Sequence, residues 1–163
     1  MTERRSERAI GLIADTHGLV RPSVRSALAG VEVILHAGDV GGPDVLDELG
    51  TIAPVIAVFG NTDPPGVPGL RQEIVMTIDG VSLHVSHGHE LGSPQPESLL
   101  ARYSEDVLVY GHTHRQLVHR DGDRLVVNPG AAGPRRFNIR PSVARLTISG
   151  GSVAVDVVGL NDD

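Results

Sequence analysis

The chain has 163 residues, enough for one domain with a buried core, and 40% of them are hydrophobic. A formal net charge of −6 and an aromatic content of 2% argue against extended nucleic-acid binding. The absence of cysteine excludes disulfides and thiolate metal sites, and the absence of lysine excludes lysine-dependent chemistry. No apolar run approaches the roughly 20 residues of a membrane span, so we expect a cytoplasmic protein with no membrane partner.

The first half of the chain alternates apolar runs with short helical patterns. We expect residues 1–8 to form a flexible, mixed-charge tail ahead of a single domain over residues 9–160. The valine, isoleucine and leucine runs show little polar alternation, which is typical of parallel strands covered on both faces. The pattern predicts strands over about 9–14, 31–37 and 54–59, and helices over about 22–29 and 43–49.

The second half contains more hairpin signals. It begins with a Pro/Gly-rich loop over 62–69, and Asp79-Gly80 between two apolar runs predicts a tight hairpin turn. We expect a helix over 93–103 and strands over about 72–78, 81–86, 107–110, 116–120, 124–127, 143–148 and 152–158. This order of elements favours an α/β fold, a four-layer α/β/β/α sandwich of two mixed sheets flanked by helices.

Seven side chains that can bind metal follow the predicted strands at the points where those strands end. They are Asp15, His17, Asp39, Asn61, His87, His112 and His114. Carboxylates, an amide oxygen and imidazoles form a ligand set suited to divalent metals. Each short motif also occurs by chance in a chain of this composition, so the prediction of metal binding depends on their combination.

The same residues carry a resemblance to a known family. The order Asp15-x-His17, Gly38-Asp39, Gly60-Asn61-x-Asp63, His87-Gly88-His89 and Gly111-His112-Thr113-His114 resembles the calcineurin-like metallophosphoesterase superfamily. Within it, the chain is most similar to the small single-domain phosphodiesterases of bacteria and archaea, over about residues 9 to 158. The resemblance implies two divalent metals, one held by Asp15, His17 and His114, the other by Asn61, His87 and His112, with Asp39 bridging both. Mn²⁺ is the first expectation, and Ni²⁺, Fe²⁺, Co²⁺ or Zn²⁺ are alternatives.

The family pattern also implies a reaction. A binuclear metal-dependent phosphodiesterase would hydrolyse a phosphate ester by direct attack of a metal-bridging hydroxide, without a covalent phosphoenzyme. Many larger members have a histidine directly after the asparagine of the third motif, and it protonates the leaving group. Here that position is Thr62, which cannot act as an acid near neutral pH. We expect either that His89 supplies the proton or that the enzyme favours leaving groups that need little protonation.

Four further residues are candidates for supporting the ligands or for binding substrate. His36 resembles a family position beside the metals, where we expect it to orient Asp39 or a neighbour. Asp63 belongs to the third motif. Arg135 and Arg136 offer planar guanidinium groups that suit phosphate oxygens, although a solvated pair of loop arginines explains them equally well.

Three other functions are compatible with this sequence. A phosphomonoesterase fits the motifs as well as a phosphodiesterase does. A non-catalytic binding module, as in the retromer subunit that resembles this fold, would have a degraded metal site, whereas all seven positions here keep donor side chains. Nucleases of the superfamily carry large added domains that we do not expect here. The expected partner is a small-molecule or nucleotide-like phosphodiester, and a homo-oligomer is left open.

Overall fold

The computed structural model of the protein describes residues 7–161. Residues 1–6 of the expected tail lie outside the described residues. Arg8 already belongs to the first strand, because it pairs with Ile148 of a neighbouring strand. The first strand therefore begins one residue earlier than the sequence predicts. Within the described range, no helix is long and apolar enough to cross a membrane.

Six strands form the first sheet, in the order β11-β10-β1-β2-β3-β4. Their bounds are β1 (Arg8–Ile13), β2 (Val33–His36), β3 (Val55–Val58), β4 (Leu70–Arg71), β10 (Ser142–Ser149) and β11 (Ser152–Gly159). Strands β1 to β4 are parallel, whereas β10 is antiparallel to both β1 and β11. The sequence prediction lacks β4, because two residues are too few to show a strand periodicity.

Five strands form the second sheet, in the order β5-β6-β7-β9-β8. They are β5 (Ile74–Ile78), β6 (Val81–Val85), β7 (Val107–Val109), β8 (Leu117–Asp121) and β9 (Arg124–Asn128). The central strands β6, β7 and β9 are parallel, and β5 and β8 pair with them in the antiparallel sense at the two edges. Asp79 (φ 48°) and Gly80 (φ 82°) connect β5 to β6 as the expected tight turn.

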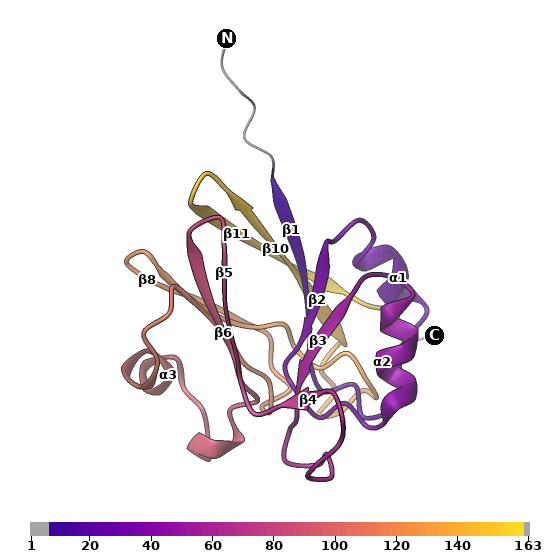
Figure 1. Ribbon diagram of the computed structural model, residues 1–163. Helices are drawn as coiled ribbons and strands as arrows, with labels where there is room; N and C mark the ends of the chain where they lie inside the picture. Colours follow the sequence, from indigo (N-terminus) through magenta and orange to yellow (C-terminus); the bar gives the residue numbers. More distant parts are fainter. Residues whose placement is uncertain (1–6, 162–163) are drawn as a thin grey trace.

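The two sheets pack against each other, and the helices cover their outer faces (Figure 1). Helices α1 (Ser23–Ala27) and α2 (Pro43–Gly50) lie on the first sheet, and α3 (Pro96–Arg102) lies on the second, preceded by the 3₁₀ turn η1 (His89–Leu91). In β1, Leu12 faces the other sheet while Ile13 faces the helices, and both are fully buried. Burial on both faces explains the continuous apolar runs, and the α/β/β/α sandwich is confirmed.

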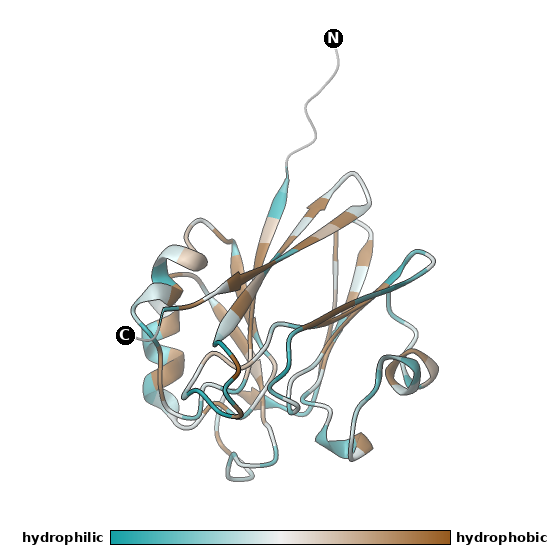
Figure 2. Cartoon of the chain, turned by 180° about the vertical axis from the view of Figure 1, so that it is seen from behind, coloured by the Kyte–Doolittle hydropathy of each residue, from teal (hydrophilic) through white to brown (hydrophobic). Residues whose placement is uncertain are grey.

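The loops that follow the parallel strands gather at one end of the sandwich, the lower end in Figure 1. Hydropathy follows this division, because the strands are mainly hydrophobic and the lower loops are largely polar or neutral (Figure 2). Ligand sites in sheets of this kind lie beyond the carboxyl ends of the strands. The fold therefore brings the five motifs of the sequence to one edge.

Candidate metal centre

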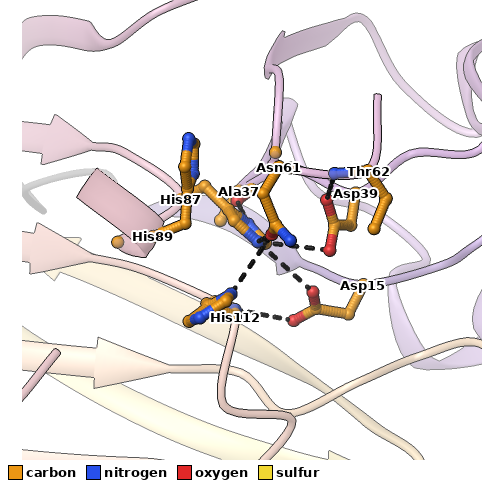
Figure 3. Close-up of polar contacts among 12 residues, drawn as sticks. Asp15, Ala37, Asp39, Asn61, Thr62, His87, His89 and His112 are labelled. Carbon is orange, nitrogen blue, oxygen red and sulfur yellow. Dashed lines mark hydrogen bonds and ion pairs between the residues drawn. The ribbon is translucent and has the colours of Figure 1, made fainter. Parts of the chain in front are cut away.

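Loops after β1, β2, β3, β6 and β7 bring all seven predicted ligands together, and Figure 3 shows five of them. On one side, Asn61 Oδ1 lies 3.1 Å from His87 Nε2 and 3.2 Å from His112 Nδ1. On the other side, the Nε2 atoms of His17 and His114 are 3.3 Å apart. The ligands thus fall into the two groups that the sequence predicts.

Two aspartates lie between these groups. Asp39 Oδ2 is 3.3 Å from His87 Nε2 and 3.8 Å from His17 Nε2. Asp15 Oδ1 lies 3.9 Å from His87 Nε2, 4.0 Å from His17 Nε2 and 3.6 Å from His114 Nε2. Both carboxylates therefore reach both groups, so the geometry offers two candidates for a bridging ligand where the sequence indicates Asp39 alone.

The donor set fits divalent cations. Asp15 is fully buried, and its Oδ1 has no hydrogen-bond partner among the described residues. A buried carboxylate oxygen in this state costs free energy unless a cation compensates it. His87 Nδ1 donates to the carbonyl of Ala37 at 2.8 Å, which directs the lone pair of Nε2 into the centre. Metal-binding atoms lie within 4.8 Å of one another in two sets, Asp15–His17–His114 and Asp15–Asp39–His87.

Burial dominates the electrostatics of the ligands. It raises the pKa of Asp15 to about 7, and it lowers the pKa of His114 to about 4, with a further contribution from His17. Burial also acts to raise the pKa of Asp39, but hydrogen bonds from His87 and Thr62 outweigh it and hold that pKa well below its usual range. A bound cation would compensate the burial of Asp15 and favour its ionised form.

Five of the seven ligands have a left-handed backbone that residues other than glycine seldom adopt. The φ angles are 53° at Asp15, 46° at His17, 54° at Asp39, 72° at His112 and 63° at His114. Each such conformation costs on the order of 1–3 kcal/mol and persists only where the surrounding structure enforces it. Strain concentrated at one edge of the sheets is typical of a functional site.

Glycines in the motifs allow the loops to approach each other closely. A Cβ at Gly60 would overlap the backbone nitrogen and Oδ1 of Asp39. A Cβ at Gly111 would lie 2.9 Å from Asp15 Oδ2 and 3.0 Å from the Cβ of Ala14. The Gly-Asn and Gly-His pairs of the sequence therefore have a steric reason, which only the contacts between loops reveal.

Two of the predicted supporting residues bind loop atoms within the protein. His36 is fully buried, accepts a hydrogen bond from Gly38 N at 3.1 Å and donates through Nε2 to Thr16 Oγ1 at 2.9 Å. Burial lowers the pKa of His36 to about 3, so its ring is neutral. The buried Asp63 carboxylate accepts hydrogen bonds from the backbone N–H groups of Val40, Gly41 and Gly60. These contacts tie together the loops that carry Asp39 and Asn61.

The two predicted arginines lie in an exposed loop on the His114 side of the centre. Arg135 and Arg136 are both exposed, and the charge of Arg136 contributes, after burial and His17, to the lowered pKa of His114. The neighbouring Phe137 is 74% exposed, and its ring centroid is 6.4 Å from that of His114. The loop thus places cationic and aromatic groups at the rim of the centre.

His89 lies at the opposite side of the centre, in the turn η1. Its ring centroid is 5.3 Å from that of His87 and 6.4 Å from that of His112. Its Nδ1 is 3.7 Å from Glu90 Oε2, and 30% of its side chain is exposed. The imidazole is therefore next to the second group of ligands and open to solvent.

Asn128 supports the site in a way that the sequence pattern does not predict. This residue ends β9, is fully buried, and donates through Nδ2 to Gly111 O at 3.1 Å and to Thr113 Oγ1 at 3.0 Å. It thereby fixes the loop that carries His112 and His114. The available signal is an asparagine before Pro-Gly at a strand end, which by itself indicates only a turn.

The chain belongs to the calcineurin-like phosphoesterase superfamily, because residues 9–151 match the domain that defines it. It is 36% identical over 160 residues to a probable metallophosphoesterase of Methanothermobacter thermautotrophicus, with 91% of each chain covered. A phosphodiesterase of Methanocaldococcus jannaschii is 30% identical over 139 residues, which cover 74% of this chain and 82% of the relative. The structure is also similar to Vacuolar Protein Sorting 29 of Cryptosporidium parvum, with a TM-score of 0.84, 26% identity, and 96% and 93% of the two chains covered.

The contact between Gly60 and Asp39 provides a first test of the centre. We expect Gly60→Ala to weaken Mn²⁺ binding roughly 10–100-fold, as changes beside a metal ligand typically do, because the added Cβ displaces Asp39. Isothermal titration calorimetry measures this affinity, and urea unfolding of the metal-free variant checks its fold. Gly50→Ala, at the end of α2, is the matched control, because its Cβ meets no atom within 4 Å. Equal affinity in the two variants would show that Asp39 is not part of the site.

Proposed function

We propose that the protein is a metal-dependent phosphodiesterase with a binuclear centre. Asp15, His17 and His114 would hold one divalent ion, Asn61, His87 and His112 would hold the other, and Asp39 would be the ligand shared by both. The observation that carries this proposal is the position of Asp39 Oδ2, which lies within 3.8 Å of an imidazole nitrogen in each group. The phosphodiesterase of M. jannaschii, a relative over 74% of the chain, supports the choice of a diester.

The proposed reaction is direct hydrolysis, with water attacking phosphorus and no covalent phosphoenzyme. When bound, two divalent ions would lower the pKa of the attacking water and clamp the oxygens of an in-line displacement. Two divalent ions would bring four positive charges, and the chain supplies only two carboxylates to balance them. The metal-bound centre would therefore be positive within a protein of net charge −6. Such a field attracts the anionic diester. The exposed guanidinium groups of Arg135 and Arg136 are suited to the phosphate oxygens that remain.

We propose His89 as the group that protonates the leaving oxygen. Thr62 cannot take this part, since a hydroxyl is not an acid near neutral pH, and its backbone N–H is already donated to Asp39 Oδ1 at 2.9 Å. His89 is the imidazole outside the ligand set that lies beside His87 and His112. Its partial exposure allows it to exchange protons with solvent.

A non-catalytic binding module is the second candidate, because the fold is similar to Vacuolar Protein Sorting 29. The complete set of seven donors and the strained backbone at five of them weigh against it. A surface that only docks a protein has no need of buried, closely spaced carboxylates and imidazoles.

The centre predicts activity that depends on added metal. Protein stripped with a chelator should not hydrolyse bis(4-nitrophenyl) phosphate, and Mn²⁺ should restore turnover. In Asp39→Asn, the rate that Mn²⁺ restores should be lower by at least about 100-fold than in the wild-type protein. The reason is that the amide lacks the charge that a bridging ligand supplies. The matching monoester in the same assay measures the preference for diesters. Metal binding without turnover of either ester would point to a narrow natural substrate, whereas neither metal binding nor turnover would favour the binding module.

The proposed acid predicts a selective effect of His89→Ala. Release of an alkoxide needs a proton, so a dialkyl phosphate should be hydrolysed roughly 10²–10⁴-fold more slowly by the variant. A diester with a 4-nitrophenolate leaving group should change by less than about threefold. His119→Ala, a histidine in β8, is the matched control. Equal slowing of both substrates in His89→Ala would exclude this role.

A further inference from the structure

A pocket of about 250 Å³ lies beside the centre, on the side of His89. Its walls include Phe59, Ser86, Glu90 and Tyr103. Two of these residues come from the loops that carry the ligands, since Phe59 is two residues before Asn61 and Ser86 directly precedes His87. The pocket therefore borders the loops that carry the second group of predicted ligands. Its volume is below the roughly 300–1,000 Å³ of drug-sized sites and suits a group about as large as one sugar ring.

A network of contacts holds the walls of this pocket in place. Glu90 accepts hydrogen bonds from Tyr103 Oη at 3.1 Å and from Gly88 N at 3.2 Å. Tyr103 stacks on His84 with ring centroids 3.8 Å apart, and His84 Nε2 is 2.9 Å from Glu73 Oε2. The carboxylates of Glu73 and Glu90 are thus fixed on the wall before any ligand arrives, which lowers the entropic cost of binding.

The pocket contains polar atoms that lack partners. Ser86 is buried and lies close enough to Glu90 to lower the pKa of that carboxyl, yet its hydroxyl makes no hydrogen bond of acceptable geometry among the described residues. His89 Nδ1 is also without one. Unsatisfied polar atoms of this kind cost free energy unless a ligand or water reaches them. A ligand with several hydroxyl groups can both donate and accept, and so would satisfy them.

The charged and aromatic side chains of the pocket restrict the chemical class of its ligand further. Carboxylates repel an anion, so the phosphate itself belongs at the metal centre and the pocket takes an organic group. Arg102 also lines the pocket, which makes a cation less suitable than a neutral donor of hydrogen bonds. The chain has two phenylalanines and two tyrosines, and one of each, Phe59 and Tyr103, lines this pocket. Aromatic faces beside carboxylates suit the apolar face and the hydroxyl groups of a sugar.

We propose that this pocket binds one organic group of the diester and selects a vicinal diol, as in a ribose or a glycerol unit. The inference rests on the proposed function, because it places the phosphorus at the centre beside His89. Glu73 and Glu90 accept hydrogen bonds from the hydroxyl groups of the diol, and Ser86 forms a further hydrogen bond with it.

Two diesters with the same 4-nitrophenolate leaving group test this proposal, because 4-nitrophenolate needs no proton from His89 and so leaves the pocket on that side to the other organic group. The 2,3-dihydroxypropyl and propyl 4-nitrophenyl phosphates differ only in the diol, so the ratio of their kcat/KM values reports recognition of that group. We expect a ratio of about ten or more in the Mn²⁺-loaded protein, as hydrogen bonds to charged acceptors provide. The ratio should fall toward one in Glu73→Gln and Glu90→Gln. Glu48→Gln, on the exposed surface of α2, makes the same chemical change and should keep the wild-type ratio.

The outcomes separate this proposal from the proposed function. A wild-type ratio near one, or a high ratio that neither pocket variant lowers, would overturn the diol pocket while metal-dependent turnover still supports the phosphodiesterase. If Glu90 only supported the local structure, Glu90→Gln would hydrolyse both diesters more slowly by the same factor and the ratio would stay unchanged. If neither diester is hydrolysed, the proposed function fails instead.

Binding can also be measured without turnover. Saturation-transfer NMR with methyl β-D-ribofuranoside should show contact with the wild-type protein and a weaker signal with Glu90→Gln. No transfer to the wild-type protein would overturn the pocket assignment, even if both diesters proved inert.

Discussion

The burial of the Asp15 and Asp39 carboxylates at one edge of the sheets is the constraint on which the rest of this structure depends. The cost is greatest at Asp15, because its buried Oδ1 has no hydrogen-bond partner among the described residues and burial raises its pKa to about 7. Divalent cations remove the cost, and the imidazoles that surround Asp15 are the ligands such cations take.

The loops are built to tolerate this arrangement. Left-handed backbone at Asp15 and Asp39 turns both side chains toward the centre immediately after their strands. Gly60 leaves room for the Asp39 carboxylate, and Asp63 joins the two loops through three backbone hydrogen bonds. The strain is sustained because each loop continues from a strand that is buried on both faces. The packing of the rigid sandwich thus offsets the free-energy cost of the strained backbone at the centre.

Much of this could be predicted from the sequence, because the determining signals are local. Apolar runs mark the buried strands, and a donor residue directly after each run marks the edge where parallel strands end. Contacts between distant loops could not be predicted in this way. The hydrogen bond from His112 N to Asp15 Oδ2 spans 97 residues, and it holds the Asp15 carboxylate beside the loop that carries His112. The pocket beside His89 also depends on contacts between distant parts of the chain. Phe59 follows β3 of the first sheet, whereas Tyr103 precedes β7 of the second.

A crystal structure of the Mn²⁺-loaded protein, with anomalous scattering recorded at the manganese edge, tests the central claim most directly. We expect two peaks about 3.5–4 Å apart, one among Asp15, His17 and His114 and one among Asn61, His87 and His112, with Asp39 between them. A single peak, or two peaks joined by Asp15 with Asp39 turned away, would contradict the assignment of the bridging ligand and with it the proposed centre.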